Sequence, residues 1–424
     1  MRFGRTAGGW LVLMALTLGG LPARAAELAI SCGAVGMEYE LCRSGAEAWA
    51  AGSGHSVQVV TAPSSSSERL ALYQQLLAAG APDIDLFQVD IIWPGILGNH
   101  FVDLGPRVPE AVLAMHFPAL IESNRVDDRL VALPWFSSAG VLYYRRDLLE
   151  EYGEPVPATW AGLTASAERI QAAERSAGNS RLWGFVWQGR AYEGLTCNAL
   201  EWVASHGGGR IIEADGRVSI NNERAAAALD LAAGWVGSIS PPGTPNYAEE
   251  EARGVFQSGN AVFMRNWPYA WALAQSEDSP VRGRVGVAPL PGGDPGQPAS
   301  TLGGWQLAVS RYSEHPGPAA ELALYLTSAA EQKRRALLVT YIPTMPHLYR
   351  DPEVLATNPF FAELEVTVEQ AVTRPSAVAG SAYNRVSSRF WNAVHRVLTG
   401  GGPAGPVLAR LERDLKRILR LAGR

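Results

Sequence analysis

The pattern of apolar positions in the first part of the chain predicts strands separated by an amphipathic helix. Glu27–Cys32 (ELAISC) reads as a strand, Ser56–Val60 (SVQVV) alternates as a second, and Ile84–Val89 is a short apolar run typical of a third. Between the last two, apolar residues at helical spacing predict a helix over Ser67–Ala79 that ends at Gly80. Strands and a helix in this order favour a mainly parallel α/β sheet.

The rest of the chain contains two longer β-prone runs and several amphipathic segments. Leu133–Arg145 reads as a strand that crosses from one lobe to a second, and Gln297–Ser310 reads as the return crossing. Helices are predicted over Thr159–Arg175 and Asn222–Trp235, each with its first residue as the N-cap. Pro403–Leu421 has an apolar face opposite its arginines, which predicts a terminal helix with a solvated basic face.

The composition is that of a globular protein too long for one core. Hydrophobic residues make up 47% of the chain and charged residues 18%. A length of 424 residues predicts two lobes, because single cores rarely grow that large. The net charge of -5, without a long basic block, disfavours nucleic acid as a partner. Thirteen tryptophans exceed ordinary usage and favour a carbohydrate or another ring-bearing ligand.

The N-terminus has the pattern of an export signal. Arg2 and Arg5 precede an apolar stretch at Trp10–Leu21. The A-x-A pattern Ala23–Ala25 places the mature start near Ala26. The apolar stretch is shorter than the ~20 residues of a membrane span. We therefore expect a soluble periplasmic protein.

Three cysteines permit one disulfide in an oxidising compartment. Cys32 and Cys42 are the expected partners, because they would close a short loop. Cys197 then stays a free thiol, and its apolar neighbours favour buried packing over a role as a nucleophile.

The segment Gly259–Ala272 (GNAVFMRNWPYAWA) places aromatic residues on both sides of a proline. Flat aromatic faces beside hydrogen-bonding groups suit a sugar, whose ring has apolar C–H faces and a hydroxyl rim. Tryptophan clusters also occur in hydrophobic cores, so this segment alone leaves both interpretations open. Two motifs follow in order, GVAPLP at Gly286–Pro291 and TLGGW at Thr301–Trp305, and the ordered set is more specific than any one of them.

In this order, the motifs resemble those of the extracytoplasmic solute-binding proteins of ABC sugar importers, and among these the trehalose/maltose-binding branch. The resemblance implies an α/β, two-lobed periplasmic binding protein fold (type II), in which each lobe is a mainly parallel sheet flanked by helices and crossover hinge segments join the two. It implies one lobe from residues 27–137 and 302–345 and another from 138–301 and 346–424. Further matching motifs are DIDLFQVDIIW (83–93), LPWFSSAGVLYYRRDLLEEYG (133–153), PATWAGL (157–163), LWGFVWQGRAYEGL (182–195) and AVTRP (371–375).

The first lobe supplies four candidate ligand-binding residues. Asp90 follows an apolar strand, and side chains just beyond the carboxyl ends of strands line the crevice of an open α/β sheet. A helix N-cap is the alternative interpretation of Asp90, and Trp93 is a candidate aromatic wall. The resemblance assigns sugar contacts to Asp90, Glu38 and Arg69. The alternatives are a helix-dipole role for Glu38 and a solvated surface position for Arg69.

Five more candidates come from later segments. By resemblance, Trp267 and Tyr269 stack on and hydrogen-bond a disaccharide. Gly304 lets the backbone approach the ligand, and the indole of Trp305 provides a floor. Arg374 matches the family's ligand arginine, whose planar donor fork can hold two hydroxyls. A structural ion pair is the alternative for Arg374.

Two positions depart from the family's pattern in the first crossing. Where the family often has a tyrosine and then an aspartate that touch sugar, this chain has Phe136 and Ser138. Loss of one partner of a buried hydrogen bond costs ~1–3 kcal/mol unless the ligand differs to match. A disaccharide-sized α-glucoside is therefore expected, and whether it is trehalose, maltose or sucrose stays open.

These features predict a monomeric receptor and not an enzyme. It would close two lobes on the sugar and deliver it to ABC permease subunits, without a cofactor or metal. The seven histidines are scattered, and the chain has neither a GxSxG nor an HExxH motif. Two alternatives remain open: a secreted glycoside hydrolase, which would use paired carboxylates, and a sugar receptor for a chemotaxis or sensor protein.

Overall fold

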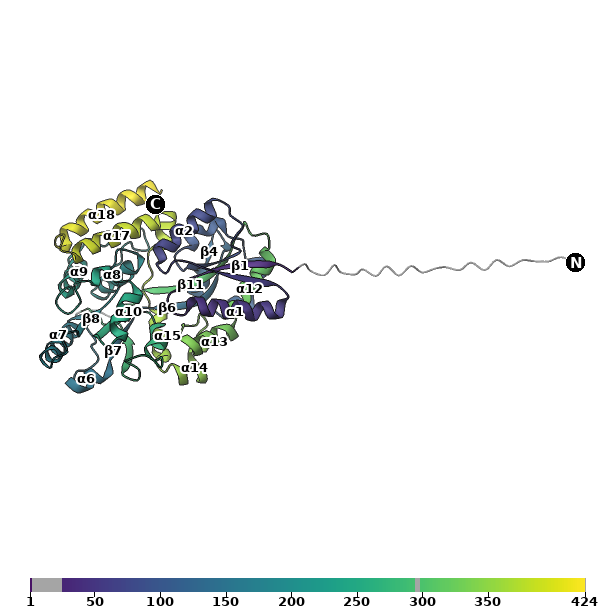
Figure 1. The fold of residues 1–424 in the computed structure, drawn as a ribbon. Helices are drawn as coiled ribbons and strands as arrows, with labels where there is room; N and C mark the ends of the chain where they lie inside the picture. Colours follow the sequence, from purple (N-terminus) through teal and green to yellow (C-terminus); the bar gives the residue numbers. More distant parts are fainter. Residues whose placement is uncertain (2–24, 294–297, 424) are drawn as a thin grey trace.

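The protein consists of two α/β lobes, each built around its own sheet (Figure 1). The computed structural model describes residues 1, 25–293 and 298–423. The basic start and the apolar stretch of the predicted export signal lie outside these residues. Within them, no helix is both long enough and apolar enough to cross a membrane.

The first lobe contains a five-stranded sheet. Across the sheet, the order is β2 (Ser56–Thr61), β1 (Glu27–Cys32), β3 (Leu86–Asp90), β11 (Leu302–Val309) and β6 (Leu133–Ala139). β1 pairs in parallel with β2 and β3, as the strand–helix–strand pattern predicts. β11 runs antiparallel to both of its neighbours, so it is the one reversed strand of a mainly parallel sheet.

Helices cover this sheet, and two of them, α2 and α13, begin at a serine whose side chain caps the helix. The side chain of Ser65 accepts the backbone N–H of Glu68. α2 therefore begins at Ser66, one residue before the predicted start at Ser67. A small hairpin of β4 (Arg125–Val126) and β5 (Arg129–Leu130) lies in the same half of the chain. The helices are α1 (Glu38–Ser53), α2 (Ser66–Ala78), α3 (Pro94–Leu97), α4 (Glu110–Leu113), α5 (Pro118–Glu122), α12 (Pro316–Leu326) and α13 (Ala329–Val339).

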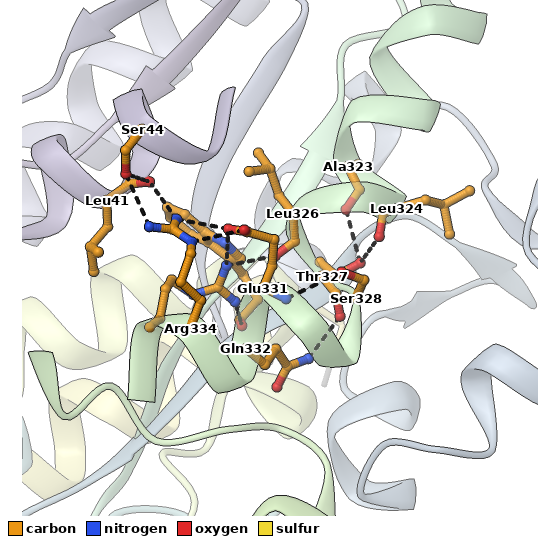
Figure 2. Close-up of polar contacts among 12 residues, drawn as sticks. Leu41, Ser44, Ala323, Leu324, Leu326, Thr327, Ser328, Glu331, Gln332 and Arg334 are labelled. Atoms are coloured by element: carbon orange, nitrogen blue, oxygen red, sulfur yellow. Dashed lines mark hydrogen bonds and ion pairs between the residues drawn. The ribbon is translucent and has the colours of Figure 1, made fainter. Parts of the chain in front are cut away.

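Covalent and polar links fix α1 in this lobe. A disulfide joins Cys32 at the end of β1 to Cys42 in α1, as expected, with a Cα–Cα distance of 6.5 Å. Arg334 of α13 reaches across to α1, where its guanidinium donates to Oγ of Ser44 at 3.2 Å and to the carbonyl of Leu41 at 3.4 Å (Figure 2). The same group forms an ion pair of 2.8 Å with Glu331. α1 is thus held both to the neighbouring strand β1 and to α13, which is distant in the sequence.

The second lobe contains a four-stranded sheet. Its order is β10 (Val285–Pro289), β7 (Val141–Arg145), β9 (Ala261–Asn266) and β8 (Trp183–Val186). β8 and β9 are parallel, whereas β7 runs antiparallel to both β9 and β10. Each sheet therefore has one reversed strand, and in both cases it is the strand by which the chain enters that sheet from the other lobe.

Only Gly140 separates β6 in the first sheet from β7 in the second. The run predicted over Leu133–Arg145 is therefore divided between two sheets, which makes it a crossing segment. The return runs from β10 in the second sheet to β11 in the first. The residue limits given above for the two lobes stay a prediction.

The second lobe has its own core and a layer of long helices. Thr159 and Asn222 cap α7 and α9 by accepting the backbone N–H of Gly162 and Ala225. The C-terminal α18 packs on α17 at the edge of this lobe (Figure 1). The helices are α6 (Arg146–Tyr152), α7 (Trp160–Ser176), α8 (Glu193–Ser205), α9 (Glu223–Trp235), α10 (Glu249–Gln257), α11 (Ala270–Ala274), α16 (Ser376–Ala379), α17 (Tyr383–Leu398) and α18 (Ala404–Leu421). Two more helices follow α13 in the chain: α14 (Pro352–Thr357) packs on α13, and α15 (Phe361–Glu369) contacts β6 of the first sheet and β10 of the second.

Four of the thirteen tryptophans form part of this core and carry no information about a ligand. Trp160, Trp187, Trp202 and Trp235 are buried and contact one another, with ring centroids 5.0–6.4 Å apart. The inference from a high tryptophan count to a ring-bearing ligand was too broad, because these indoles fill the space between α7, α8, α9 and the sheet.

Candidate functional site

A cavity with an empty volume of about 720 Å³ lies between the two lobes. Both crossing segments, the loop after β1 and the starts of α8 and α10 contribute to its walls. The structure brings nine of the eleven predicted residues to this cavity: Glu38, Asp90, Phe136, Ser138, Trp267, Tyr269, Gly304, Trp305 and Arg374.

The other two, Arg69 and Trp93, lie behind the cavity wall. The guanidinium carbon of Arg69 is 4.2 Å from the ring centroid of Trp305. Trp93 meets Trp305 edge-on, with ring centroids 5.5 Å apart. Arg69 is fully buried, so the interpretation of it as a solvated surface residue is wrong. Both side chains support the indole of Trp305.

Glu38 is the first residue of α1 and is buried at the cavity. Its Oε2 lies 3.4 Å from Nη2 of Arg69. Burial raises the pKa of Glu38, and the charge of Arg69 opposes that rise. Glu38 therefore both begins a helix and lines the cavity.

One guanidinium joins carboxylates that come from different lobes. Nη2 of Arg374 donates to Oδ1 of Asp90 at 2.8 Å, and Nη1 donates to Oε1 of Glu193 at 3.1 Å. Burial disfavours the charge of Arg374, but Asp90 above all holds its pKa well above the ordinary value. Arg374 thus forms ion pairs and also lines the cavity.

Asp90 also accepts a hydrogen bond from a nearby backbone N–H, as a helix N-cap would. Its Oδ1 accepts the backbone N–H of Ile92 at 3.1 Å. This contact stabilises a turn, because the next helix begins only at Pro94 and has Trp93 as its N-cap. Asp90 is therefore a turn residue at the cavity and not a helix N-cap.

Glu193, the first residue of α8, has a central place at the cavity that the sequence patterns did not indicate. Besides Arg374, its carboxylate accepts the hydroxyls of Tyr383 at 2.5 Å and Ser387 at 2.7 Å. Burial raises the pKa of Glu193, and the charge of Arg374 opposes the rise. The available signal was the motif LWGFVWQGRAYEGL (182–195), which contains Glu193 and was one of the matching motifs.

Glu249, the first residue of α10, is a second missed residue of the cavity wall. Its Oε1 accepts Nε1–H of Trp267 at 3.3 Å, and its Oε2 accepts the hydroxyl of Tyr192 at 2.6 Å. The next residue, Glu250, accepts the hydroxyl of Tyr269 at 2.6 Å. The run of three glutamates at positions 249–251 was the signal for these contacts.

The two departures from the family's pattern lie on the cavity wall as part of the first crossing. Phe136 stacks on Tyr341, with ring centroids 4.4 Å apart and an interplanar angle of 7°. Tyr341 also lines the cavity and was not identified from the sequence. Phe136 and Tyr341 together form a further flat aromatic surface beside Ser138.

Gly304 has a φ of 133°, a backbone conformation that favours glycine. A Cβ atom there would stand 2.7 Å from the carbonyl oxygen of Phe136, so glycine lets β11 approach β6. The close approach therefore serves strand packing.

The cavity combines aromatic surfaces with hydrogen-bonding side chains. Such a surface can stack on an apolar ring face while carboxylates, hydroxyls and a guanidinium bond to a polar rim. Among the described residues, no group of three or more His, Cys, Asp or Glu side chains is arranged to hold a metal ion.

Comparison with known proteins agrees with this architecture. A family model described as bacterial extracellular solute-binding protein matches residues 43–333. A probable ABC transporter-binding protein of Deinococcus radiodurans is 49% identical over 397 residues, which is 93% of this chain and 94% of that relative.

Solved structures agree over a similar extent. Maltose-bound MalE3 of T. maritima has a TM-score of 0.88 and 38% sequence identity, covering 93% of this chain and 100% of that one. A solute-binding protein of Thermotoga lettingae with bound α-D-tagatose has a TM-score of 0.82 and 22% identity over 93% of this chain and 100% of that one. The second likeness concerns the fold alone.

Proposed function

This chain belongs to the bacterial extracellular solute-binding proteins, and from this premise we propose that it captures a disaccharide-sized α-glucoside and delivers it to an ABC permease. Trehalose, maltose and sucrose are the ligands of this size and linkage that we consider first. The cavity between the lobes carries the proposal, because two indoles and several hydrogen-bonding side chains line it. The likeness to a maltose-bound protein at 38% identity supports a carbohydrate.

The proposed roles follow from the chemistry of each side chain. Trp267 and Trp305 stack on the faces of the sugar rings, and Tyr269 adds a hydroxyl beside an aromatic face. Asp90 accepts sugar hydroxyls, and Arg374 donates to them. Further ligand contacts are proposed for Glu38, Phe136, Ser138 and Gly304, and for Glu193 and Glu249.

We propose that capture involves no covalent chemistry. The ligand need only favour the arrangement in which the two lobes lie together, since binding energy then shifts the population toward that state. Arg374 supports this mechanism, because it bonds to Asp90 at the end of β3 and to Glu193 at the start of α8. In this proposal a monomer acts outside the cytoplasm, and the permease recognises the closed state.

Calorimetry on the protein without its predicted leader tests the proposal. Trehalose, maltose, sucrose, palatinose, glucose and a polyol are titrated separately, and the mixtures are then analysed for products. One-to-one binding of a disaccharide without turnover is the expected result. Binding of the polyol or glucose alone would overturn the ligand class, and hydrolysis by pure protein would favour a glycoside hydrolase.

A further inference from the structure

A buried ion pair lies behind the indole of Trp267. The guanidinium carbon of Arg265 is 4.0 Å from the ring centroid of Trp267. Nε and Nη2 of Arg265 donate to the two carboxylate oxygens of Glu201, at 2.8 and 2.5 Å. Trp267 lines the cavity, whereas Arg265 and Glu201 are fully buried and do not line it. The guanidinium therefore covers the face of the indole that is turned away from the cavity.

Every nitrogen of the guanidinium already donates a hydrogen bond within the protein. Its third nitrogen, Nη1, donates to Oε1 of Gln188 at 3.0 Å. Gln188 in turn donates to the backbone carbonyl of Arg265 at 3.0 Å. Glu201 keeps the pKa of Arg265 above its ordinary value even though burial alone would lower it. Arg265 is thus a charged, planar group that hydrogen bonds from all three nitrogens hold behind the ring.

Both crossing segments contact this ion pair. The backbone N–H of Thr301, on the return crossing, donates to Oε1 of Glu201 at 3.0 Å. Gly140, between β6 and β7, lies so close that a Cβ atom there would stand 2.6 Å from Nη2 of Arg265. The pair therefore sits where the chain passes between the lobes, and a side chain at position 140 would displace it.

Two further contacts limit the movement of the Trp267 ring. Its Nε1–H donates to Glu249 at 3.3 Å. Its outer edge faces Gly303, where a Cβ atom would stand 3.1 Å from Cζ3. With Arg265 behind the ring, the face toward the cavity is the one left open.

The first lobe repeats this arrangement behind the other indole. Arg69 lies behind Trp305, is paired with Glu38, and has a glycine, Gly33, against the ion pair. A Cβ atom at Gly33 would stand 2.5 Å from Nη1 of Arg69. This second copy is looser, because the Arg69–Glu38 distance is 3.4 Å and Nη1 of Arg69 has no hydrogen-bond partner among the residues that the structure describes.

We propose that Glu201 and Arg265 are positioning residues that hold the open face of Trp267 in the orientation needed to stack on the ligand. The proposal rests on the proposed function, in which Trp267 contacts a sugar. Glu201 fixes the guanidinium, the guanidinium fixes one face of the ring, and neither residue touches the ligand. A ring without this backing would turn about its side-chain torsions and stack less well.

A double variant removes the pair without leaving a buried unpaired charge: Glu201→Gln with Arg265→Met. We expect it to bind the sugar identified by calorimetry at least tenfold more weakly. In a Trp267→Ala background, the same two changes should cost no further affinity, because there is no ring left to position. An equal loss of affinity with and without Trp267 would overturn the proposal.

A matched control exists in the same lobe. Arg175 lies over Trp183 with a guanidinium carbon to centroid distance of 4.3 Å, and neither residue lines the cavity. Arg175→Met should leave the affinity unchanged. A tenfold loss in this control would mean that any disturbance of a stacked arginine in this lobe weakens binding, and would overturn a specific role for Arg265.

A spectroscopic measurement needs no ligand and separates this proposal from the proposed function. The protein is labelled with 5-fluorotryptophan, and the Trp267 resonance is assigned by its absence in Trp267→Phe. In the double variant this resonance should shift or broaden while the resonance of Trp183 stays in place. An unchanged Trp267 resonance would overturn the positioning role, even if every tested sugar failed to bind the wild type.

Discussion

Gly36 and Tyr269 come from different lobes, and a Cβ atom at Gly36 would stand 2.6 Å from Cδ2 of the tyrosine ring. Gly36 lies between β1 and α1, and Tyr269 follows β9. The φ of Gly36 is 57°, so its backbone conformation also favours glycine. The two lobes therefore come together over a position that has no room for a side chain.

Gly36→Ala should weaken sugar binding at least tenfold, because the added methyl group keeps Tyr269 from its place in the closed arrangement. Gly54→Ala is the matched control, since Gly54 has a φ of 75° and a Cβ atom there meets nothing within 4 Å. Both changes should cost about 1 kcal/mol in the free energy of unfolding through backbone strain. Calorimetry and thermal unfolding measure the two effects. Equal affinities of the two variants would show that closure does not need this contact.

Trp305→Ala should weaken sugar binding at least tenfold, about 1.4 kcal/mol, because it removes an aromatic face from the cavity. Trp183→Ala removes an indole of the other lobe that does not line the cavity. Calorimetric titration of both variants is the measurement. If Trp305→Ala bound as tightly as Trp183→Ala, Trp305 would not contact the ligand.

Arg374→Met should lower the free energy of unfolding by about 3–5 kcal/mol, because it leaves the carboxylates of Asp90 and Glu193 without their shared partner. Arg43→Met breaks exposed pairs with Glu40 and Glu47 and should cost far less. Urea unfolding compares the two. Adding Glu193→Gln to Arg374→Met should recover part of the loss, and no recovery would mean that the carboxylate of Glu193 is not what destabilises the variant.

Local patterns predicted those parts of the fold that depend on neighbouring residues. The β1 strand matches its predicted range, and the caps at Thr159 and Asn222 are present because a capping side chain bonds to an N–H only three residues away. Contacts between distant segments were not predictable in the same way. The Glu201–Arg265 pair joins residues 64 positions apart, and nothing near either residue indicates its partner.

The same difference between local patterns and long-range contacts explains which residues of the candidate site the sequence could predict. Asp90 was identified because the end of a strand places a side chain at the crevice. Arg69 was assigned to the ligand or to solvent, yet it is buried beneath Trp305, which lies in a segment more than two hundred positions later. The number of tryptophans likewise could not say which indoles line a cavity and which fill a core.

The disulfide between Cys32 and Cys42 should contribute about 2–3 kcal/mol to the free energy of unfolding, because it closes a loop and so lowers the conformational entropy of the unfolded chain. The double variant Cys32→Ser with Cys42→Ser tests this by urea unfolding. Reduction of the wild type should give a similar loss, and reduction of the double variant should give none. A loss on reduction of the variant would point to an effect of the reductant elsewhere.

The buried side chain of His116 should lower the stability of the protein as the pH falls. It is buried between α4 and α5, with Nδ1 2.7 Å from Oγ1 of Thr344. Burial lowers the pKa of His116 to about 4, and nearby His347 adds to the lowering. In the unfolded chain a histidine takes up its proton near pH ~6.5. Between these two pH values the unfolded state binds more protons, so the free energy of unfolding falls as the pH falls.

The titration of His116 alone should lower the free energy of unfolding by about 3 kcal/mol between pH ~6.5 and pH 4. His116→Gln removes the titrating group, so its free energy of unfolding should fall less steeply over that range than that of the wild type. His347→Gln should leave most of the slope in place, because burial is the larger cause of the lowered pKa. Urea unfolding at several pH values measures all three proteins. If His116→Gln kept the full slope, other groups would carry the acid sensitivity; if His347→Gln removed it, the neighbouring charge rather than burial would be the cause.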